Sequence, residues 1–434
     1  MNNKIKNRYI LQQIIAQLDN DLVIILVGAR QVGKTFLVKN LIIQHLSEKY
    51  PTTKHLYFDL EKPDTLAHFV GYDTIVSYLT GQGIDPKISN FIIIDEFQKM
   101  SDPTKTLKIL HDHFPLLKII ATGSAALDIY QKLRAESLAG RKRVFSVFTL
   151  DFMEYLNFTD NLNLSDTYAR LLADETIQPT SFLAELNPAW ENFVIWGGYP
   201  RAALLPSDAE RQATLAEIYQ AYTERDIAGI LKESDTIPFT KMVGLLAVQV
   251  GNIFNLNEIA KMLGVSRFKL EKYLFVLEKT FIIRLVPPFF TNRQKEIIKM
   301  PKLFFLDNGL RNWAVKNFGA LDLRSDNGRL MENAVFAELL KHLPLGAEIN
   351  FWRTPQGAEV DFVLTAGAKI VPVEVKFQNL EKASVPSGLK AFIERYEPKT
   401  ALVLSKNFFG EMEYKNCVIK FLPAFMAARV AMNF

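Results

Sequence analysis

The sequence contains a single cysteine and no long apolar run. Cys417 alone can form neither an internal disulfide nor a cysteine-type zinc site within one chain, and this favours a reducing setting. The longest apolar runs, such as LVIILVG and FIII, have the length of strands and are far too short to span a membrane. The N-terminal MNNKIKNRYI lacks the apolar core of a signal peptide. We therefore expect a cytoplasmic protein without a membrane partner.

A strong charge of one sign is also missing. The 51 Lys and Arg residues against 47 Asp and Glu residues leave a formal net charge of +4, which by itself does not indicate nucleic-acid binding. The composition, 49% hydrophobic and 23% charged with 32 Phe, is that of a globular protein with large cores. A chain of 434 residues is too long for one ordinary core and predicts two to four domains.

A phosphate-binding loop is the most specific motif. The apolar run LVIILV (22–27) predicts a strand buried on both faces, and GARQVGKT follows at once. The next residues, FLVKNLIIQHL, have helical periodicity, so the motif lies between a strand and a helix. We expect its backbone N–H groups to surround phosphates, Lys34 to reach the β- and γ-phosphates, and Thr35 to offer a hydroxyl to Mg²⁺. The predicted nucleotide-binding residues of this loop are Gly28, Ala29, Arg30, Gln31, Val32, Gly33, Lys34 and Thr35.

Two further strands end in polar residues. FIIIDEF (91–97) predicts a buried strand with Asp95 and Glu96 at its tip. We assign Asp95 to Mg²⁺ and Glu96 to polarising the attacking water as general base, although a solvated strand end is also compatible with this pair. LLKIIATGS (116–124) ends in Thr122 and Ser124, which are candidates for sensing the γ-phosphate or for simply capping the strand.

The stretch ESLAGRKRVF (136–145) places Arg141 in a basic loop before an apolar run. An arginine supplied by a neighbouring subunit would stabilise charge on a transferring phosphoryl group. A plain basic surface loop is the alternative.

The order GARQVGKT, YFDLEKPD, IIIDEFQKM, ATGSAALDI and ESLAGRKRVF resembles that of the AAA-type ATPases of bacteria and archaea that carry a C-terminal domain of unknown function. The resemblance implies ATP and Mg²⁺ as cofactors. It favours Arg141 as the arginine that acts in trans, and therefore a homo-oligomer, with a hexameric ring as one form. It implies an α/β fold with a parallel-sheet AAA+ core.

We predict four regions: the ATPase core at 1–150, a helical lid at 151–235, a winged helix at 236–312 and a nuclease-like α/β domain at 313–434. The lid reads as mainly helical, with loops at NLNLSDT and NPAW, and WGGYPR (196–201) predicts a turn.

The winged-helix prediction rests on the segment 255–290. Asn257 is the expected cap of a first helix that ends at Gly264, and Ser266 is the expected cap of a second helix, followed by a strand or wing. Residues 261–302 include ten basic and three acidic residues, and such an excess of positive charge is typical of segments that contact the phosphate backbone. The predicted DNA-binding residues are Arg267, Lys269 and Lys272. A purely structural winged helix with a solvated charged face is the alternative.

The C-terminal region carries a second candidate site. A helix at 328–343 bears Glu332, a hairpin at 349–367 bears Asp361 in mid-strand, and the next strand, VPVEVKF, bears Glu374 and Lys376. A strand Asp followed by Glu-x-Lys resembles the restriction-endonuclease-like nucleases. Asp361 and Glu374 would hold Mg²⁺, Glu332 would complete the metal shell, and Lys376 would stabilise a hydroxide or the transition state. The alternatives are a nuclease-like fold without cleavage and a surface ion pair.

The sequence therefore favours an AAA+ ATPase that couples ATP hydrolysis to DNA binding and remodelling, including translocation or branched-DNA processing. Two alternatives stay open: a nucleotide-gated, protein-binding signalling switch in defence or toxin control, and an ATP-regulated, Mg²⁺-dependent nuclease.

Overall fold

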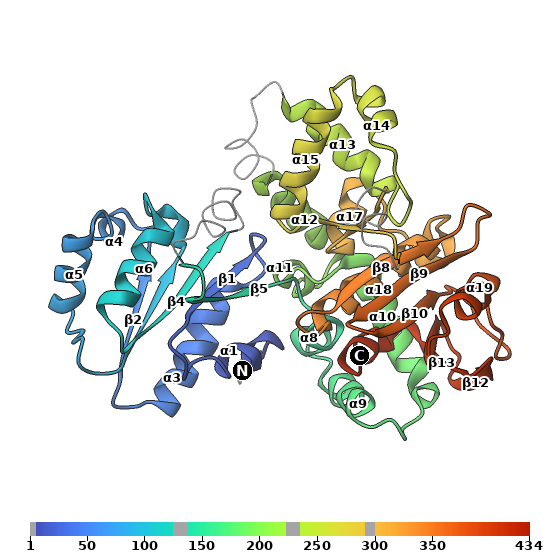
Figure 1. Ribbon diagram of the computed structural model, residues 1–434, viewed down its shortest axis with the longest axis horizontal. Helices are drawn as coiled ribbons and strands as arrows, with labels where there is room; N and C mark the ends of the chain where they lie inside the picture. Colours follow the sequence, from blue (N-terminus) through green and yellow to red (C-terminus); the bar gives the residue numbers. More distant parts are fainter. Residues whose placement is uncertain (1–5, 125–137, 223–234, 291–299) are drawn as a thin grey trace. The chain divides into compact units, whose positions relative to one another are not determined.

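The computed structural model describes residues 6–124, 138–222, 235–290 and 300–434. It divides into two compact units (Figure 1). Unit 1 contains the described residues up to Thr149 together with Lys279–Phe281, and unit 2 contains the other described residues from Leu150 to Phe434. The expected end of the ATPase core at residue 150 stays a prediction. The further division of the C-terminal part into three domains stays a prediction. No helix in the described part of the chain is long and apolar enough to cross a membrane.

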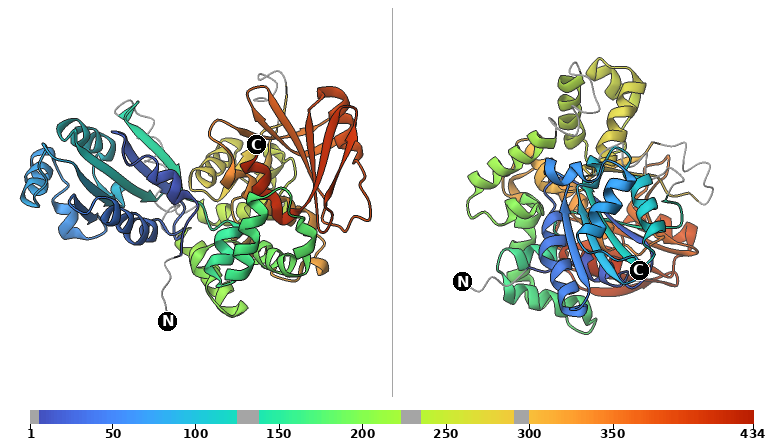
Figure 2. Two further views of the ribbon diagram at one scale, coloured as in Figure 1. Left: turned by 90° about the horizontal axis from the view of Figure 1, so that it is seen from below. Right: turned by 90° about the vertical axis from the view of Figure 1, so that its left-hand side faces the viewer.

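Unit 1 is a five-stranded parallel sheet with the strand order β2-β3-β4-β1-β5. Figure 2 shows helices on both of its faces. Its strands are β1 Val23–Gly28, β2 Lys54–Asp59, β3 Asn90–Asp95, β4 Leu117–Ser124 and β5 Lys142–Ser146. Its helices are α1 Ile10–Ile15, α2 Lys34–Phe36, the π-helical η1 Leu37–Ile42, α3 Ile43–Lys49, α4 Pro63–Ala67, α5 Tyr72–Gly81, the short η2 Phe97–Lys99 and α6 Pro103–His113.

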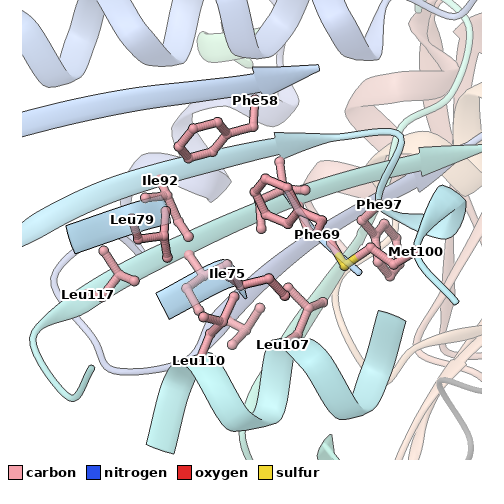
Figure 3. Close-up of a cluster of buried hydrophobic side chains, with 14 of the residues drawn as sticks. Phe58, Phe69, Ile75, Leu79, Ile92, Phe97, Met100, Leu107, Leu110 and Leu117 are labelled. Atoms are coloured by element: carbon pink, nitrogen blue, oxygen red, sulfur yellow. The ribbon is translucent and has the colours of Figure 1, made fainter. Parts of the chain in front are cut away.

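The strands predicted at 22–27, in 91–97 and in 116–124 are confirmed as β1, β3 and β4. All residues of these three strands are buried, as expected for strands covered on both faces. One face packs against α5 and α6, where Ile75, Leu79, Leu107 and Leu110 meet Ile92 and its neighbours (Figure 3). This packing fixes the carboxyl ends of the strands, at which the polar residues lie.

Unit 2 combines a helical part with a six-stranded mixed sheet of order β12-β13-β11-β10-β9-β8 and a two-stranded sheet β6-β7. Its longer helices are α8 Phe152–Phe158, α9 Leu162–Ala173, α10 Leu183–Trp196, α12 Asp208–Ala221, α13 Thr236–Val248, α14 Leu256–Leu263, α15 Arg267–Lys279, α17 Asn308–Ala314, α18 Asn327–His342 and α19 Ser387–Tyr396. The shorter ones are η4 Pro179–Phe182, α11 Pro200–Ala203, η7 Leu321–Leu323, η8 Ala424–Met426 and α20 Ala427–Met432. Its strands are β6 Ile283–Val286, β7 Lys302–Phe305, β8 Glu348–Arg353, β9 Glu359–Ala366, β10 Lys369–Val375, β11 Thr400–Ser405, β12 Gly410–Tyr414 and β13 Cys417–Pro423.

Both loops predicted in the helical part are wrong. The NLNLSDT stretch lies largely in α9, because burial of Tyr168 and Leu171 on one face outweighs the turn preference of its Asn, Ser and Asp residues. The NPAW stretch lies inside α10 although it contains Pro188. An internal proline costs about 3 kcal/mol, but Trp190 and Phe193 are buried on that helix, and burying side chains of this size contributes about 1.5–3 kcal/mol each.

The segment 255–290 has the expected helix, glycine turn and second helix. Gly264 has a φ of 66°, and the Lys269 N–H donates to Ser266 Oγ at 3.2 Å, so both predicted end signals are confirmed. The first cap is Asn255 rather than Asn257, because the Asn255 side chain accepts the Asn257 N–H at 3.0 Å. The strand that follows, β6, pairs antiparallel with β7.

Two glycine-containing motifs meet inside unit 2, far apart in sequence. The Gly198 N–H donates to Asp307 Oδ2 at 2.8 Å. A Cβ on Gly197 would lie 2.2 Å from Asp307 Oδ1, and a Cβ on Gly309 would lie 2.0 Å from Trp196 O. The WGGYP turn and the Asp307–Gly309 turn therefore fit against each other only because these residues are glycines. Their contact holds the helical part of unit 2 to its C-terminal part.

Candidate functional site

The phosphate loop connects β1 to the helix that starts at Lys34. Gln31 and Gly33 have positive φ angles of 60° and 94°, which turn the chain back toward the strand. A Cβ on Gly28 would lie only 2.2 Å from Val147 O, so no other residue fits there. The Lys34 ammonium is buried and donates to Gly28 O at 3.0 Å and to Ala29 O at 2.7 Å. The loop thus surrounds a cation at a helix N-terminus, an arrangement that favours phosphate.

Asp95 is the centre of a hydrogen-bonded group of three hydroxyls. Its Oδ2 accepts from Thr35 Oγ1 at 2.9 Å and from Tyr57 OH at 2.6 Å. Its Oδ1 accepts from Thr122 Oγ1. The strand order explains the group, because β4 lies between β1 and β3 and brings Thr122 between the loop and the acidic strand. A carboxylate and a hydroxyl at this spacing suit Mg²⁺, whose preferred ligands are oxygen atoms.

Glu96 follows Asp95 in a left-handed conformation with φ of 58°, which turns its side chain away from the strand direction. Its carboxylate accepts from Gln98 Nε2, which also donates to Ser124 Oγ at 2.9 Å. Burial raises the pKa of the Glu96 carboxyl above its usual range, and the Lys34 ammonium opposes this shift. A carboxylate with a raised pKa is suited to accept a proton from water.

Sequence reasoning missed two members of this group, Tyr57 and Gln98. Tyr57 lies on β2, and its hydrogen bond to Asp95 raises the tyrosine pKa further beyond the effect of burial. Gln98 links Glu96 to Ser124. Both residues lie within stretches that carry the family resemblance, YFDLEKPD and IIIDEFQKM, but only the three-dimensional structure gives them a partner.

Arg141 lies at the opposite end of the sheet from the phosphate loop. Its carbonyl accepts the Val23 N–H at 2.9 Å, at the start of β1, whereas the loop follows Gly28 at the end of this strand. At about 3.3 Å per residue the two ends of β1 are about 17 Å apart. The Arg141 side chain forms an ion pair with Asp112 at 3.2 Å and is partly exposed. Arg141 therefore does not reach the phosphate loop of its own chain, and its predicted role requires a second subunit.

The second candidate site lies in unit 2. Antiparallel pairing of β9 with β10 places Asp361 beside Glu374, and Asp361 Oδ2 accepts the Val375 N–H at 2.8 Å. Glu374 Oε1 forms an ion pair with Lys376 Nζ at 2.6 Å, while the buried Glu374 Oε2 has no hydrogen-bond partner in the described part of the chain. The side chain of Glu332, on α18, interacts electrostatically with both carboxylates.

These carboxyl groups are strongly perturbed. Burial, reinforced by Asp361, raises the pKa of Glu332 to about 8 and that of Glu374 to about 7. Burial likewise raises the pKa of Asp361. Such crowding of buried carboxyl groups is relieved by a bound cation. The orphaned Glu374 Oε2 and the acidic donor set fit Mg²⁺ in chemistry. However, the described residues contain no group of three His, Cys, Asp or Glu side chains placed to hold a metal ion together.

Sequence reasoning missed two residues of this cluster, Lys302 and Glu359. Lys302 Nζ pairs with Glu359, and Glu359 also contacts Arg353 at 3.5 Å. Burial alone would lower the pKa of Lys302, but Asp361, Glu332 and Glu359 together raise it. Lys302 is therefore a buried cation inside the acidic cluster. Sequence reasoning counted it only among basic residues of the winged-helix segment.

The predicted DNA-binding residues lie on α15. Arg267 forms an ion pair with Glu271 at 2.8 Å, and Lys269 forms one with Asp235. Lys272 is exposed on the same helix. Two of the three cations thus already have acidic partners, whereas Lys272 has no ion pair among the described residues.

Family models match three parts of the chain. Residues 20–156 match a family described as "AAA domain", residues 187–321 match a "Domain of unknown function (DUF8612)", and residues 327–423 match a "Domain of unknown function (DUF4143)".

The chain is similar to uncharacterized proteins of two bacteria and one archaeon. It is 24% identical to one of Haemophilus influenzae over 409 residues, which cover 92% of each protein. It is 25% identical to one of Mycobacterium tuberculosis over 369 residues, which cover 84% of this chain and 71% of the relative. It is 25% identical to one of Methanocaldococcus jannaschii over 349 residues, which cover 78% and 71%.

Among solved structures, the Aeropyrum pernix Orc1 protein in complex with DNA matches at 11% identity and a TM-score of 0.29, over 71% of this chain and 91% of that chain. Cdc6p from Pyrobaculum aerophilum matches at 14% identity and a TM-score of 0.28, over 70% and 93%. These similarities are too slight to support a functional conclusion. The family matches confirm the resemblance seen in the motifs: the chain carries an AAA domain in unit 1 and a C-terminal domain of unknown function, DUF4143, in unit 2.

Proposed function

We propose that the protein is an ATPase that hydrolyses ATP at the Gly28–Thr35 loop and couples this reaction to DNA binding and remodelling. One observation carries the ATPase part. Thr35 and Asp95 are 60 residues apart in sequence, yet their side chains share a hydrogen bond of 2.9 Å. This contact brings the two expected Mg²⁺ ligands together beside the buried Lys34.

Each residue of this group has a role in the proposed reaction. Lys34 would give up its hydrogen bonds to the loop carbonyls and donate to phosphate oxygens instead. The loop N–H groups would hold the remaining phosphate oxygens. Thr35 and Asp95 would hold Mg²⁺, which supplies counter-charge for the phosphates. Glu96 would accept the proton of the attacking water, with Gln98 holding its carboxylate in place. Thr122 would orient Asp95 through their hydrogen bond.

The ATPase proposal is tested by Lys34→Met. We expect loss of hydrolysis and about tenfold to a hundredfold weaker ATP binding, since a charge-assisted contact to phosphate contributes about 1.5–3 kcal/mol. Lys105→Met is the matched control, because Lys105 is an exposed lysine on α6 of the same unit. Hydrolysis at the wild-type rate in Lys34→Met would contradict the proposal, and equal losses in both variants would indicate a general effect on folding.

The position of Arg141 motivates a test in trans. Arg141→Ala and Lys34→Met should each be inactive alone. Mixed in equal amounts they should recover activity at about a quarter of the sites, where a subunit with Lys34 lies beside one with Arg141. Sedimentation of the mixture reports the size of the assembly. No recovery in a mixture that does assemble would show that Arg141 does not act across subunits.

The proposed DNA contact involves α15 with Arg267, Lys269 and Lys272. It is supported by the helix, turn, helix order followed by paired strands and by the exposed Lys272. We expect duplex or branched DNA to raise the ATPase rate severalfold, with a steep dependence on salt. Lys272→Ala should lower the slope of log affinity against log salt by about one unit. ATPase activity that responds to no nucleic acid would instead favour a protein-binding switch.

A second candidate function is Mg²⁺-dependent cleavage of DNA at the carboxylate cluster. It is favoured by the orphaned, buried Glu374 Oε2 beside Asp361 and Lys376. There Asp361 and Glu374 would hold the ion, and Lys376 would stabilise developing negative charge. Labelled DNA incubated with Mg²⁺ or Mn²⁺ should give product with the wild type and not with Asp361→Ala or Glu374→Ala. Equal product from all three proteins would eliminate the site.

A further inference from the structure

The carboxylate cluster of unit 2 contains more carboxyl groups than lysines. Four carboxyl groups interact within it, and two lysines face them, so two of the negative charges would lack a compensating lysine when all four groups are ionised. Arg353 contributes only through a half-exposed contact with Glu359 at 3.5 Å. The carboxylates are Glu332, Glu359, Asp361 and Glu374, and the lysines are Lys302 and Lys376.

The two lysines come from different parts of the chain. Lys376 immediately follows β10, within the same domain as the carboxylates it faces. Lys302 begins β7, which pairs with β6 in the segment predicted as a winged helix, and it lies outside the C-terminal family match at 327–423. It is nevertheless only 2% exposed, pairs with Glu359, and has its ammonium 5.3 Å from the centre of the Phe351 ring.

Lys302 also lies at the solvent approach to the cluster. It lines a cavity of about 410 Å³ together with Glu359 and Gly251. A Cβ on Gly251 would lie 3.1 Å from Glu332 Oε2, so this lining residue of the cavity also lies next to the Glu332 carboxyl group. A cation that enters through the cavity meets the Lys302 ammonium beside the carboxylates.

We infer that Lys302 is a built-in counter-ion that competes with a divalent cation for the carboxylate cluster, so that a residue of the preceding module sets the cation affinity of the C-terminal domain. The inference rests on the second candidate function, in which the cluster binds such an ion. Lys302 is a positioning and charge-balancing residue and not a catalytic one, because its contacts are with carboxylates and an aromatic ring. Its positive charge repels any ion bound to the same carboxylates, and this repulsion is strong in a buried site.

The test is titration of nucleotide-free protein with MnCl₂, followed by calorimetry and by thermal unfolding monitored through tryptophan fluorescence. Lys302→Met should bind Mn²⁺ at least about tenfold more tightly than the wild type and should gain more thermal stability from it. Lys302→Arg, which keeps the charge, should bind as the wild type does. Should Lys302→Met fail to fold, Lys302→Gln keeps a polar head for Glu359 and tests the same loss of charge.

Lys341→Met is the matched control, because Lys341 is also a buried lysine paired with a glutamate, Glu338, at 3.4 Å. It should lose stability without a change in Mn²⁺ affinity. Tighter binding by Lys302→Met, with or without detectable binding by the wild type, supports the inference. Equal binding by wild type and Lys302→Met overturns the role of Lys302 but leaves the cation site. Absence of binding in both proteins overturns the cation site itself, and the inference with it.

Discussion

Replacement of Asp307 by alanine should destabilise unit 2, because Asp307 joins its helical part to its C-terminal part. The Asp307 carboxylate is buried and accepts two backbone N–H groups, one from Gly198 at 2.8 Å and one from Leu310 at 3.1 Å. The second bond caps α17, and loss of such a cap costs about 1 kcal/mol. The first bond, once removed, leaves a buried N–H without its acceptor, which costs about 1–3 kcal/mol. We therefore expect Asp307→Ala to lower the free energy of unfolding of unit 2 by about 2–4 kcal/mol.

The protein provides its own probe for this measurement. All four tryptophans lie in unit 2, so urea unfolding followed by tryptophan fluorescence reports on this unit alone. They are Trp190, Trp196, Trp313 and Trp352.

Ser207→Ala is the control, because the exposed Ser207 caps α12 through the Glu210 N–H at 3.3 Å and, among the described residues, its side-chain hydrogen bonds stay within that helix start. It should cost at most about 1 kcal/mol. Similar losses in Ser207→Ala and Asp307→Ala would refute the argument that the Gly198 contact joins the two parts.

The remaining predictions concern the carboxylate cluster and the pH dependence of unit 2. Gly251→Ala and Gly264→Ala both place alanine at a positive φ and should each lose about 1 kcal/mol, but only Gly251→Ala puts a methyl group against Glu332. Only that variant should lose the thermal stabilisation by Mn²⁺; the same loss in both would point to backbone strain. Burial alone would lower the pKa of His342, but its ion pair with Asp151 at 3.3 Å raises it above the usual range. The stability that this pair contributes is present below about pH 6.5 and is lost as the pH rises through the raised pKa. The stability difference between wild type and His342→Gln, measured by urea unfolding at a series of pH values, should shrink over that range, and a constant difference would contradict the assignment.

The strand, loop and helix of the predicted phosphate site could be foreseen because their signals are local. A buried strand, a glycine loop and an amphipathic helix occupy one continuous stretch, and eight residues in fixed spacing define the loop chemistry. The same holds for Gly264 and Ser266, whose roles depend on the backbone within a few residues. The structure differs from such local signals in α9 and around Pro188 in α10. There, burial of large side chains outweighed the local preference for a turn.

Contacts between distant segments were decided by tertiary structure alone. The strand order placed β4 between β1 and β3, and so gave Asp95 its bond to Thr122; β2 brought in Tyr57. The strand order also put Arg141 at the opposite end of β1 from the phosphate loop of the same chain. Lys302 lies in the carboxylate cluster, whose acidic residues come up to 72 residues later in the sequence. Its local sequence pattern had instead indicated a DNA-facing surface. By itself the sequence determined which chemical groups the protein has and what each short segment folds into. The charge balance of the cluster and the hydrogen-bond partners of the side chains depend on which segments lie side by side. The packing of the sheets decided this.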